Sequence, residues 1–248
     1  MITATSGPPG CGHAHGSCPL AMATTTGGGT ARNRWILHFT HIDNVPAIIS
    51  GGRLVCDKAA QPYLQTEVGD SAIKEARRRR VLTAGPGGTV ADYVPFYFAP
   101  RSPMMFRIAC DHRDGVPGRY PDGDRPLVYF AATAGAVVDA GLAWVATDGN
   151  AANAATEFST DVTRLDAMID WVVMVASQWK NTTTDPDRQR RRMAEFLVHR
   201  EVPLTVVHQI AAYSDWYADR VRQAVAGHAL ANRVVVRPGW YYGYGRGR

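Results

Sequence analysis

The sequence has few cysteines and no long apolar run. Its cysteines are Cys11, Cys18, Cys56 and Cys110, and they lack the paired spacing of a disulfide framework. No basic segment followed by an apolar stretch opens the chain, and no apolar run approaches the length needed to span a bilayer. These absences argue against a disulfide-rich secreted protein and against a membrane protein. We therefore expect a cytoplasmic protein without membrane contact.

Lysine is also scarce. Only Lys58, Lys74 and Lys180 occur among 27 basic residues, so nearly all of the positive charge is arginine, and the formal net charge is +5. The arginine guanidinium forms paired hydrogen bonds with phosphates and stacks on aromatic rings, which suits a nucleic-acid partner. A GC-rich coding bias would produce the same excess, so only the positions of the arginines are informative.

Residues 1–31 have almost no charge and are rich in Gly, Thr, Ala and Ser. Such a segment cannot bury enough surface to offset the entropy of ordering, so we expect a disordered tail. Its Cys11, His13, His15 and Cys18 lack the second ligand pair of a structural zinc site, and no metal is expected. Residues 32–248 have the length of a single domain.

Strand and helix patterns alternate along the rest of the chain. Short aromatic and β-branched runs predict strands at residues 35–39, 93–99, 127–131, 142–146 and 196–198. Helix formers predict helices at residues 44–49, 71–81 and 135–141, the first capped by Asn44 and stopped by two glycines. Apolar residues recur at helical spacing over residues 162–180, while residues 148–160 predict a long mobile loop. The pattern indicates a mixed α/β (α+β) fold.

The first candidate site is the segment from His38 to His41, where a predicted strand meets a turn. Side chains at a strand end can leave the sheet and meet a ligand, and imidazole with hydroxyl offers donors and acceptors for a ribose or an amide. The segment lacks the glycine pattern of a dinucleotide-binding Rossmann turn. The alternative is that His38 is a half-buried structural histidine and His41 a solvated turn residue.

The second candidate is the run of four arginines at residues 77–80 on a predicted helix. Successive helical residues point around most of the circumference, so only one or two of them can face a pocket. Lys74, Arg77 and Arg78 share one face. The alternative is a solvated basic helix in which no single arginine has a special role.

The third candidate is the aromatic block at residues 93–105, which ends in a proline-fixed turn with Arg101. Aromatic rings beside guanidinium groups suit unstacked bases, because every base has a π-face and every nucleotide a phosphate. A core strand has the same composition.

The fourth candidate is Glu195, a lone carboxylate between the basic residues 188–192 and an apolar strand. A partly desolvated carboxylate there can bind a sugar hydroxyl and stabilise positive charge. The alternative is an ordinary ion pair with Arg191 or Arg192.

Together these segments resemble the DarT family, toxins that ADP-ribosylate single-stranded DNA on a fold like that of the ADP-ribosyltransferases. The matching blocks are residues 38–44, 92–104, 194–198 and 240–242, in the same order, and residues 148–190 match loosely. The resemblance implies transfer of ADP-ribose from NAD to a base, thymine before guanine, with release of nicotinamide. It also implies a toxin of a toxin–antitoxin pair, with a macrodomain antitoxin as partner.

The resemblance also implies roles for individual residues. The expected NAD contacts are His38, Phe39, Thr40, Ala47, Val55 and Arg77. Arg77 and Glu195 are the expected catalytic residues, with Arg78 as the rival of Arg77 because consecutive arginines leave the register uncertain by one. The substrate strand would meet a loop at residues 147–192. The expected DNA contacts are Tyr97, Arg101, Arg78 and Arg192.

Two other functions fit the same residues. One is an ADP-ribosyltransferase or NAD glycohydrolase that acts on protein or RNA, because the NAD site says little about the acceptor. The other is a nucleic-acid-binding module without turnover, for which arginines and aromatics suffice. Nicotinamide release that depends on Glu195 would exclude the second.

Overall fold

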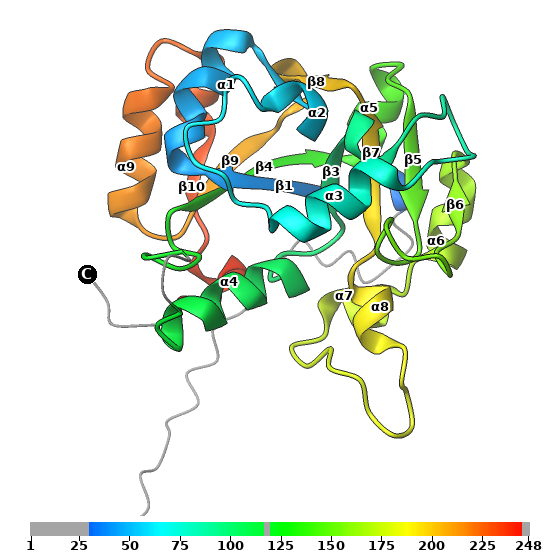
Figure 1. Cartoon of the computed structure of the whole chain (residues 1–248). Helices are drawn as coiled ribbons and strands as arrows, with labels where there is room; N and C mark the ends of the chain where they lie inside the picture. The colour runs from blue at the N-terminus through cyan, green and yellow to red at the C-terminus, as the bar shows by residue number, and fades with distance from the viewer. Residues whose placement is uncertain (1–29, 117–119, 245–248) are drawn as a thin grey trace, which may run out of the picture.

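An eight-stranded mixed sheet lies at the centre of the structure (Figure 1), a computed structural model that describes residues 30–116 and 120–244. The strand order is β10-β9-β4-β1-β3-β7-β5-β6. The strands are β1 (Trp35–His41), β3 (Tyr93–Tyr97), β4 (Leu127–Thr133), β5 (Trp144–Thr147), β6 (Phe158–Ser159), β7 (Glu195–His199), β9 (Gln209–Ala212) and β10 (Val234–Val236). Neighbouring strands are antiparallel except β9 and β10. A separate pair joins β2 (Arg53–Val55) to β8 (Glu201–Pro203).

Helices and loops cover both faces of this sheet (Figure 1). They are α1 (Val45–Gly51), α2 (Asp57–Ala60), α3 (Ser71–Arg79), α4 (Pro103–Arg113), α5 (Ala134–Asp139), α6 (Leu165–Met168), α7 (Trp171–Val175), α8 (Arg188–Arg192) and α9 (Asp215–Ala224). Alternate residues of a strand point to opposite faces. Phe96 and Phe130 accordingly pack in one core, and Leu37 and Tyr129 pack with α4 in the other. The central strands are therefore apolar on both sides.

The structure confirms the mixed α/β class and all five predicted strands, with shifted ends. The strand expected at 35–39 continues to His41, and that expected at 93–99 stops at Tyr97. The first helix ends at Gly51 and is capped by Gly52, whose φ of 67° favours glycine and whose N–H donates to the Ile49 carbonyl. The strands and helices after residue 199 were not predicted.

Two local predictions were wrong. Residues 162–180 do not form one helix, because Ile169 is extended and Asp170 starts a new helix by accepting the Val173 N–H. Asn44 does not cap α1. Its amide reaches across to Thr40 and Thr66 instead. At Asn44 the contact with Thr66, 22 residues away in sequence, outweighs the local preference for a cap.

The region expected to be a mobile loop, residues 148–160, contains β6 and hydrogen-bonded turns. Most of the expected disordered tail, residues 1–29, lies outside the described residues, as do the four candidate zinc ligands. Ala31 is buried, and its N–H donates to Asp166. None of the helices that the structure describes is long and apolar enough to cross a membrane.

Candidate active site

Helix α3 carries two cationic side chains to a cavity beside the sheet, which we call the active-site pocket. It begins because the Asp70 carboxylate accepts the N–H groups of Ala72 and Ile73, which caps its first turn. Lys74 and Arg77 lie three residues apart and thus on one face of the helix. Both line the pocket.

Arg77 pairs with Glu195 across 118 residues of sequence. Its Nη1 donates to both carboxylate oxygens of Glu195, at 3.0 Å each. The Glu195 side chain is 1% exposed and that of Arg77 12%. This carboxylate therefore has neither Arg191 nor Arg192 as its partner, so the alternative ion pair expected from the sequence is wrong.

The start of β7 fixes the position of Glu195. The Glu195 N–H donates to the Thr147 hydroxyl, at 2.9 Å, and Thr147 in turn donates to the Gly149 carbonyl. Tyr97 lies directly opposite Glu195 in the pairing of β3 with β7. The backbone of Glu195 is thus fixed between two neighbouring strands, and its carboxylate is held by Arg77.

Charge keeps Arg77 protonated. Burial by itself would lower the pKa of its guanidinium, but the charge of Glu195 and the hydrogen bonds to it raise that pKa above the ordinary arginine value. Burial raises the pKa of the Tyr97 phenol, and the charge of Glu195 adds to the effect. Both groups are therefore hydrogen-bond donors at neutral pH, and neither is a base.

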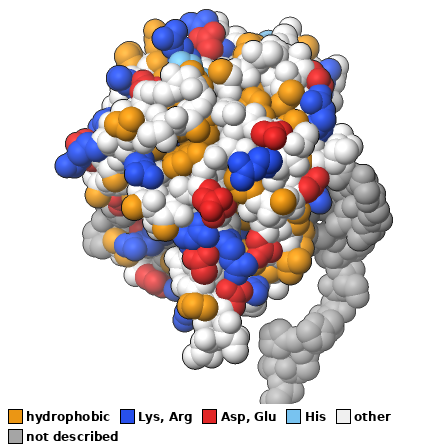
Figure 2. All heavy atoms as spheres, turned by 90° about the vertical axis from the view of Figure 1, so that its right-hand side faces the viewer, with side chains coloured by type: hydrophobic (Ala, Val, Ile, Leu, Met, Phe, Trp, Pro, Cys, Tyr) orange, Lys and Arg blue, Asp and Glu red, His pale blue; other side chains and the backbone are white. Residues whose placement is uncertain are grey.

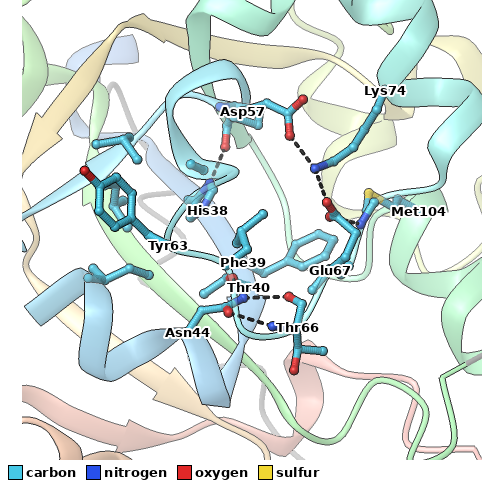
Figure 3. A pocket seen from close by; sticks show the side chains of 18 of the residues that line it. His38, Phe39, Thr40, Asn44, Asp57, Tyr63, Thr66, Glu67, Lys74 and Met104 are labelled. Carbon is cyan, nitrogen blue, oxygen red and sulfur yellow. Dashed lines mark hydrogen bonds and ion pairs between the residues drawn. The ribbon is translucent and has the colours of Figure 1, made fainter.

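A pocket of about 500 Å³ opens beside this pair. It is lined by every residue for which the sequence predicts an NAD contact, together with Glu195 and Tyr97: His38, Phe39, Thr40, Ala47, Val55 and Arg77. Figure 3 shows the side chains of His38, Phe39 and Thr40 coming from one strand into it. The structure thus brings the segments around residues 38, 77 and 195 together around one pocket.

His38 presents a neutral imidazole. Its Nδ1 lies 2.9 Å from the Pro95 carbonyl, which can only accept, so Nδ1 carries the proton and Nε2 is left as an acceptor. Burial lowers the pKa of His38, although the bond to Pro95 opposes the effect. The pocket therefore has one fixed neutral acceptor on β1.

Asn44 ties the segment before α3 to the end of β1 (Figure 3). Its Nδ2 donates to the Thr40 hydroxyl and the Thr66 carbonyl, and its Oδ1 accepts the N–H groups of Gln65 and Thr66. Four hydrogen bonds satisfy the whole amide, which is 2% exposed. The predicted contact Thr40 is thereby fixed in orientation.

Lys74 bridges two carboxylates in the same pocket (Figure 3). Its Nζ pairs with Asp57 at the start of α2 and with Glu67 in the segment before α3. The Lys74 side chain is 14% exposed. Asp57, Glu67 and Lys74 are not among the site residues predicted from the sequence, although Lys74 was expected on the same helix face as Arg77. No sequence pattern marks Asp57 or Glu67.

Three predicted DNA contacts lie outside the pocket, and one of these predictions is wrong. The Arg192 side chain is buried, where its guanidinium donates to the carbonyls of Val173, Met174 and Pro100. Burial lowers the pKa of Arg192 to about 10, so it stays charged at neutral pH but cannot reach a phosphate. Its role is to tie α8 to α7 and to the turn that follows β3.

The other two predicted DNA contacts outside the pocket, Arg78 and Arg101, are partly exposed, unlike Arg192. Arg78 points to Asp57 and Glu75 and is partly exposed, so Arg77 and not Arg78 meets Glu195. Arg101 has a φ of 56°, its carbonyl accepts the Tyr242 hydroxyl, and its guanidinium lies 4.5 Å from the Tyr242 ring centre. Tyr97, the fourth expected DNA contact, stacks on Phe39 and lines the pocket.

The basic segment before Glu195 is largely neutralised by carboxylates. Arg190 pairs with Asp148 and Asp187, and Arg191 pairs with Asp170 and Asp185. Figure 2 shows acidic and basic side chains interspersed on the face drawn there, without a continuous basic patch. The arginine count therefore overstates the charge available to a polyanion.

The arrangement defines a class. A mixed sheet that places one buried glutamate against an arginine, with a histidine–x–threonine strand in the pocket wall, is the arrangement of an ADP-ribosyltransferase. The family model described as "ssDNA thymidine ADP-ribosyltransferase, DarT" matches residues 37–242. The chain belongs to the DarT family.

Relatives described as DNA ADP-ribosyl transferases are similar along most of their length. The DNA ADP-ribosyl transferase of Mycobacterium tuberculosis is 40% identical over 222 residues, which cover 87% of this chain and 94% of that protein. The DNA ADP-ribosyl transferase of Thermus sp. 2.9 is 34% identical over 209 residues, covering 84% and 95%.

Solved structures agree with the fold. Thermus sp. 2.9 DarT in complex with ADP-ribosylated ssDNA matches with a TM-score of 0.77 and 32% identity, covering 85% of this chain and 97% of that one. Thermus sp. 2.9 DarT in complex with NAD+ matches with a TM-score of 0.73 and 31% identity, covering 86% and 100%. The architecture of the sheet and its flanking helices is therefore shared with these two structures.

Proposed function

We propose that this protein transfers ADP-ribose from NAD to a thymine base of single-stranded DNA and releases nicotinamide. The observation that carries the proposal is the Arg77–Glu195 pair inside the pocket that His38 and Thr40 also line. The family and the ligands named for the Thermus structures support the choice of NAD and of DNA.

Glu195 stabilises the sugar cation. Breaking the bond between nicotinamide and ribose leaves positive charge on the sugar, and nicotinamide departs with the bonding electrons. A fixed, buried carboxylate that accepts a hydrogen bond from a ribose hydroxyl stabilises that charge more than the ground state. Because Glu195 is 1% exposed, water screens this effect little.

Arg77 acts as a donor. The imide N3 of thymine loses its proton as it bonds to the sugar, so negative charge develops on the base. The raised pKa of Arg77 means that its guanidinium does not accept that proton. Its fixed charge stabilises the anionic base instead, while solvent takes the proton.

The rest of the pocket holds NAD. His38 offers the Nε2 acceptor, Thr40 a hydroxyl oriented by Asn44, and Phe39 a ring, while Ala47 and Val55 line the α1 and β2 side. A mostly apolar pocket with a few fixed polar groups is typical of small-molecule sites. No metal takes part in this scheme.

A modification of DNA bases blocks replication, so the activity implies a toxin that acts in the cytoplasm, where DNA and NAD meet. A Thermosipho africanus protein described as a DNA ADP-ribosyl transferase–DNA ADP-ribosyl glycohydrolase fusion is 26% identical over 214 residues, covering 85% of this chain and 50% of that protein. That fusion supports a macrodomain antitoxin that removes the modification as the partner of this chain.

The test uses purified protein, NAD and separate acceptors: single-stranded DNA, duplex DNA, RNA and protein. Mass spectrometry should find one added ADP-ribose on thymine in the single strand, with an equal amount of nicotinamide released. Glu195→Gln is the control. Transfer to RNA or protein alone, or nicotinamide release without an acceptor product, would replace this proposal by one of the two catalytic alternatives.

A further inference from the structure

A second cavity, of about 420 Å³, opens beside the active-site pocket. Side-chain amides dominate its wall, and we call it the amide groove: Asn150, Asn153, Asn181 and Gln189, with Arg190 and Met193. Asn150 and Met193 also line the active-site pocket, so the two cavities adjoin. A ligand in the groove is therefore a neighbour of whatever reacts at Glu195.

Backbone contacts fix which end of each asparagine amide is free. Oδ1 accepts a backbone N–H in all three cases: that of Ala152 for Asn150, of Ala155 for Asn153 and of Gln189 for Asn181. An N–H can donate only to the oxygen, so the amide cannot be flipped. The NH2 groups of Asn150, Asn153 and Asn181 form no hydrogen bond to any described residue. The groove thus offers several neutral donors.

Among the described residues that line the groove, Arg190 is the only cation, and carboxylates already neutralise it. The Arg190 guanidinium binds Asp148 and Asp187, and these bonds pin the loop after β5 to the start of α8. Gly149 permits this contact, because a Cβ there would lie 2.7 Å from Arg190 Nη1. The groove therefore holds no unpaired positive charge for a phosphate, and its neutral amide donors match the carbonyl oxygens of a base.

We propose that the amide groove holds the nucleobase adjacent to the target base and selects it by its carbonyl oxygens. Thymine, with carbonyls on both sides of N3, suits the NH2 groups of Asn153 and Asn181 best. Adenine has no carbonyl and suits them least. This inference rests on the proposed function, because it needs a DNA strand to lie across the active site.

Exchange of Asn for Asp provides a sharp test. In the variant Asn153→Asp/Asn181→Asp each carboxylate keeps the oxygen that accepts the backbone N–H and replaces the NH2 donor by an acceptor. Oligonucleotides with each of the four bases at each position beside one target thymine are incubated with NAD. The modified nucleotide is located by fragmentation in a mass spectrometer.

Wild-type protein should modify the target faster beside thymine than beside adenine, by about three- to tenfold, as expected for one or two neutral hydrogen bonds. The Asp variant should reverse this order in favour of adenine, which has an amino group and no carbonyl. Asn232→Asp is the matched control, because Asn232 is exposed on the 3-10 helix Ala229–Arg233, outside both cavities. It should keep the wild-type order.

Three results separate the possibilities. Wild-type protein that modifies no DNA would overturn the proposed function. Wild-type protein that modifies DNA without preference between thymine and adenine at any neighbouring position would overturn the amide groove alone. A uniform loss of rate in the Asp variant, with the order of bases unchanged, would also overturn it, because added negative charge weakens DNA binding in every context. The single variant Asn153→Asp, at an exposed turn, repeats the test should the double variant unfold.

Discussion

Arg77 reaches Glu195 through a single nitrogen, because Nη1 lies 3.0 Å from both carboxylate oxygens while Nη2 is buried without a hydrogen-bond partner among the described residues. A buried guanidinium donor without a partner is costly, and a bound substrate oxygen would relieve that cost. Arg77 thus donates to Glu195 through Nη1, and its Nη2 is free to donate to a bound substrate.

Glu195→Gln should abolish most of the turnover and leave NAD binding largely intact. Glutamine keeps the size of the side chain but loses the charge that stabilises the sugar cation, so we expect kcat to fall by about 10²- to 10³-fold. Nicotinamide release measures turnover, and calorimetry measures NAD affinity. A fall in NAD affinity with kcat unchanged would show instead that Glu195 binds NAD in the ground state.

Arg77→Gln should lower the rate of transfer, while Arg78→Gln should change it by no more than about twofold, because Arg78 is partly exposed and does not line the pocket. The comparison resolves the uncertainty between these adjacent arginines. The Arg77 variant also leaves the Glu195 charge buried without a partner, at a cost of about 3 kcal/mol in the free energy of unfolding. Rates are therefore compared well below both unfolding midpoints. Equal loss of activity in the two variants would contradict the assignment.

Sequence alone could place Glu195 at the boundary of a strand, because a polar run meets an apolar one there. Sequence alone could not show which of Arg77 and Arg192 is the partner of Glu195, since each lies in a run of arginines beside helix formers. One meets a buried carboxylate and the other three backbone carbonyls, and both contacts cross long stretches of chain. Only the family resemblance selected Arg77 in advance.

The role of Asn44 could not be predicted from the sequence either. An asparagine before a helix favours a local cap, and the sequence holds no sign of the competing Thr66 backbone. The sheet, by contrast, could be predicted from short apolar runs, because burial on both faces of β4 and β7 leaves a continuous apolar pattern.

Lys74→Met should destabilise the protein and raise the KM for NAD more than it lowers kcat. It leaves the carboxylates of Asp57 and Glu67 without their shared cation, which costs about 2 kcal/mol in the free energy of unfolding because Glu67 is partly solvated. The segment between α2 and α3 would then be held less firmly over the pocket. Lys58→Met is the control, because the exposed Lys58–Asp92 pair is worth at most about 1 kcal/mol. Equal effects of the two variants would show that the Lys74 bridge has no special role.

Acidification should destabilise the protein partly through His38. Burial lowers its pKa below 6.5, so between the lowered value and pH 6.5 the unfolded chain binds more protons than the folded one. This contribution to stability is complete above pH 6.5 and is lost as the pH falls. Three other histidines have lowered pKa values and contribute in the same sense: His41, His199 and His208. Unfolding followed between about pH 7.5 and about pH 5.5 should show a shallower dependence in His38→Gln. An unchanged slope would contradict the prediction.

Arg192→Met should reduce stability and leave the salt dependence of DNA binding unchanged. The substitution deprives the carbonyls of Val173, Met174 and Pro100 of a charged donor in a buried place, and the expected loss is about 2–4 kcal/mol in the free energy of unfolding. A residue that touches no phosphate releases no counterion, so the slope of log affinity against log salt stays the same. Arg101→Met provides the comparison, because its side chain is partly accessible beside Tyr242. If the DNA strand passes over that ring, the Arg101 variant reduces the slope by about one and the Arg192 variant does not. A reduced slope in the Arg192 variant, measured under conditions in which it is folded, would restore Arg192 as a DNA contact.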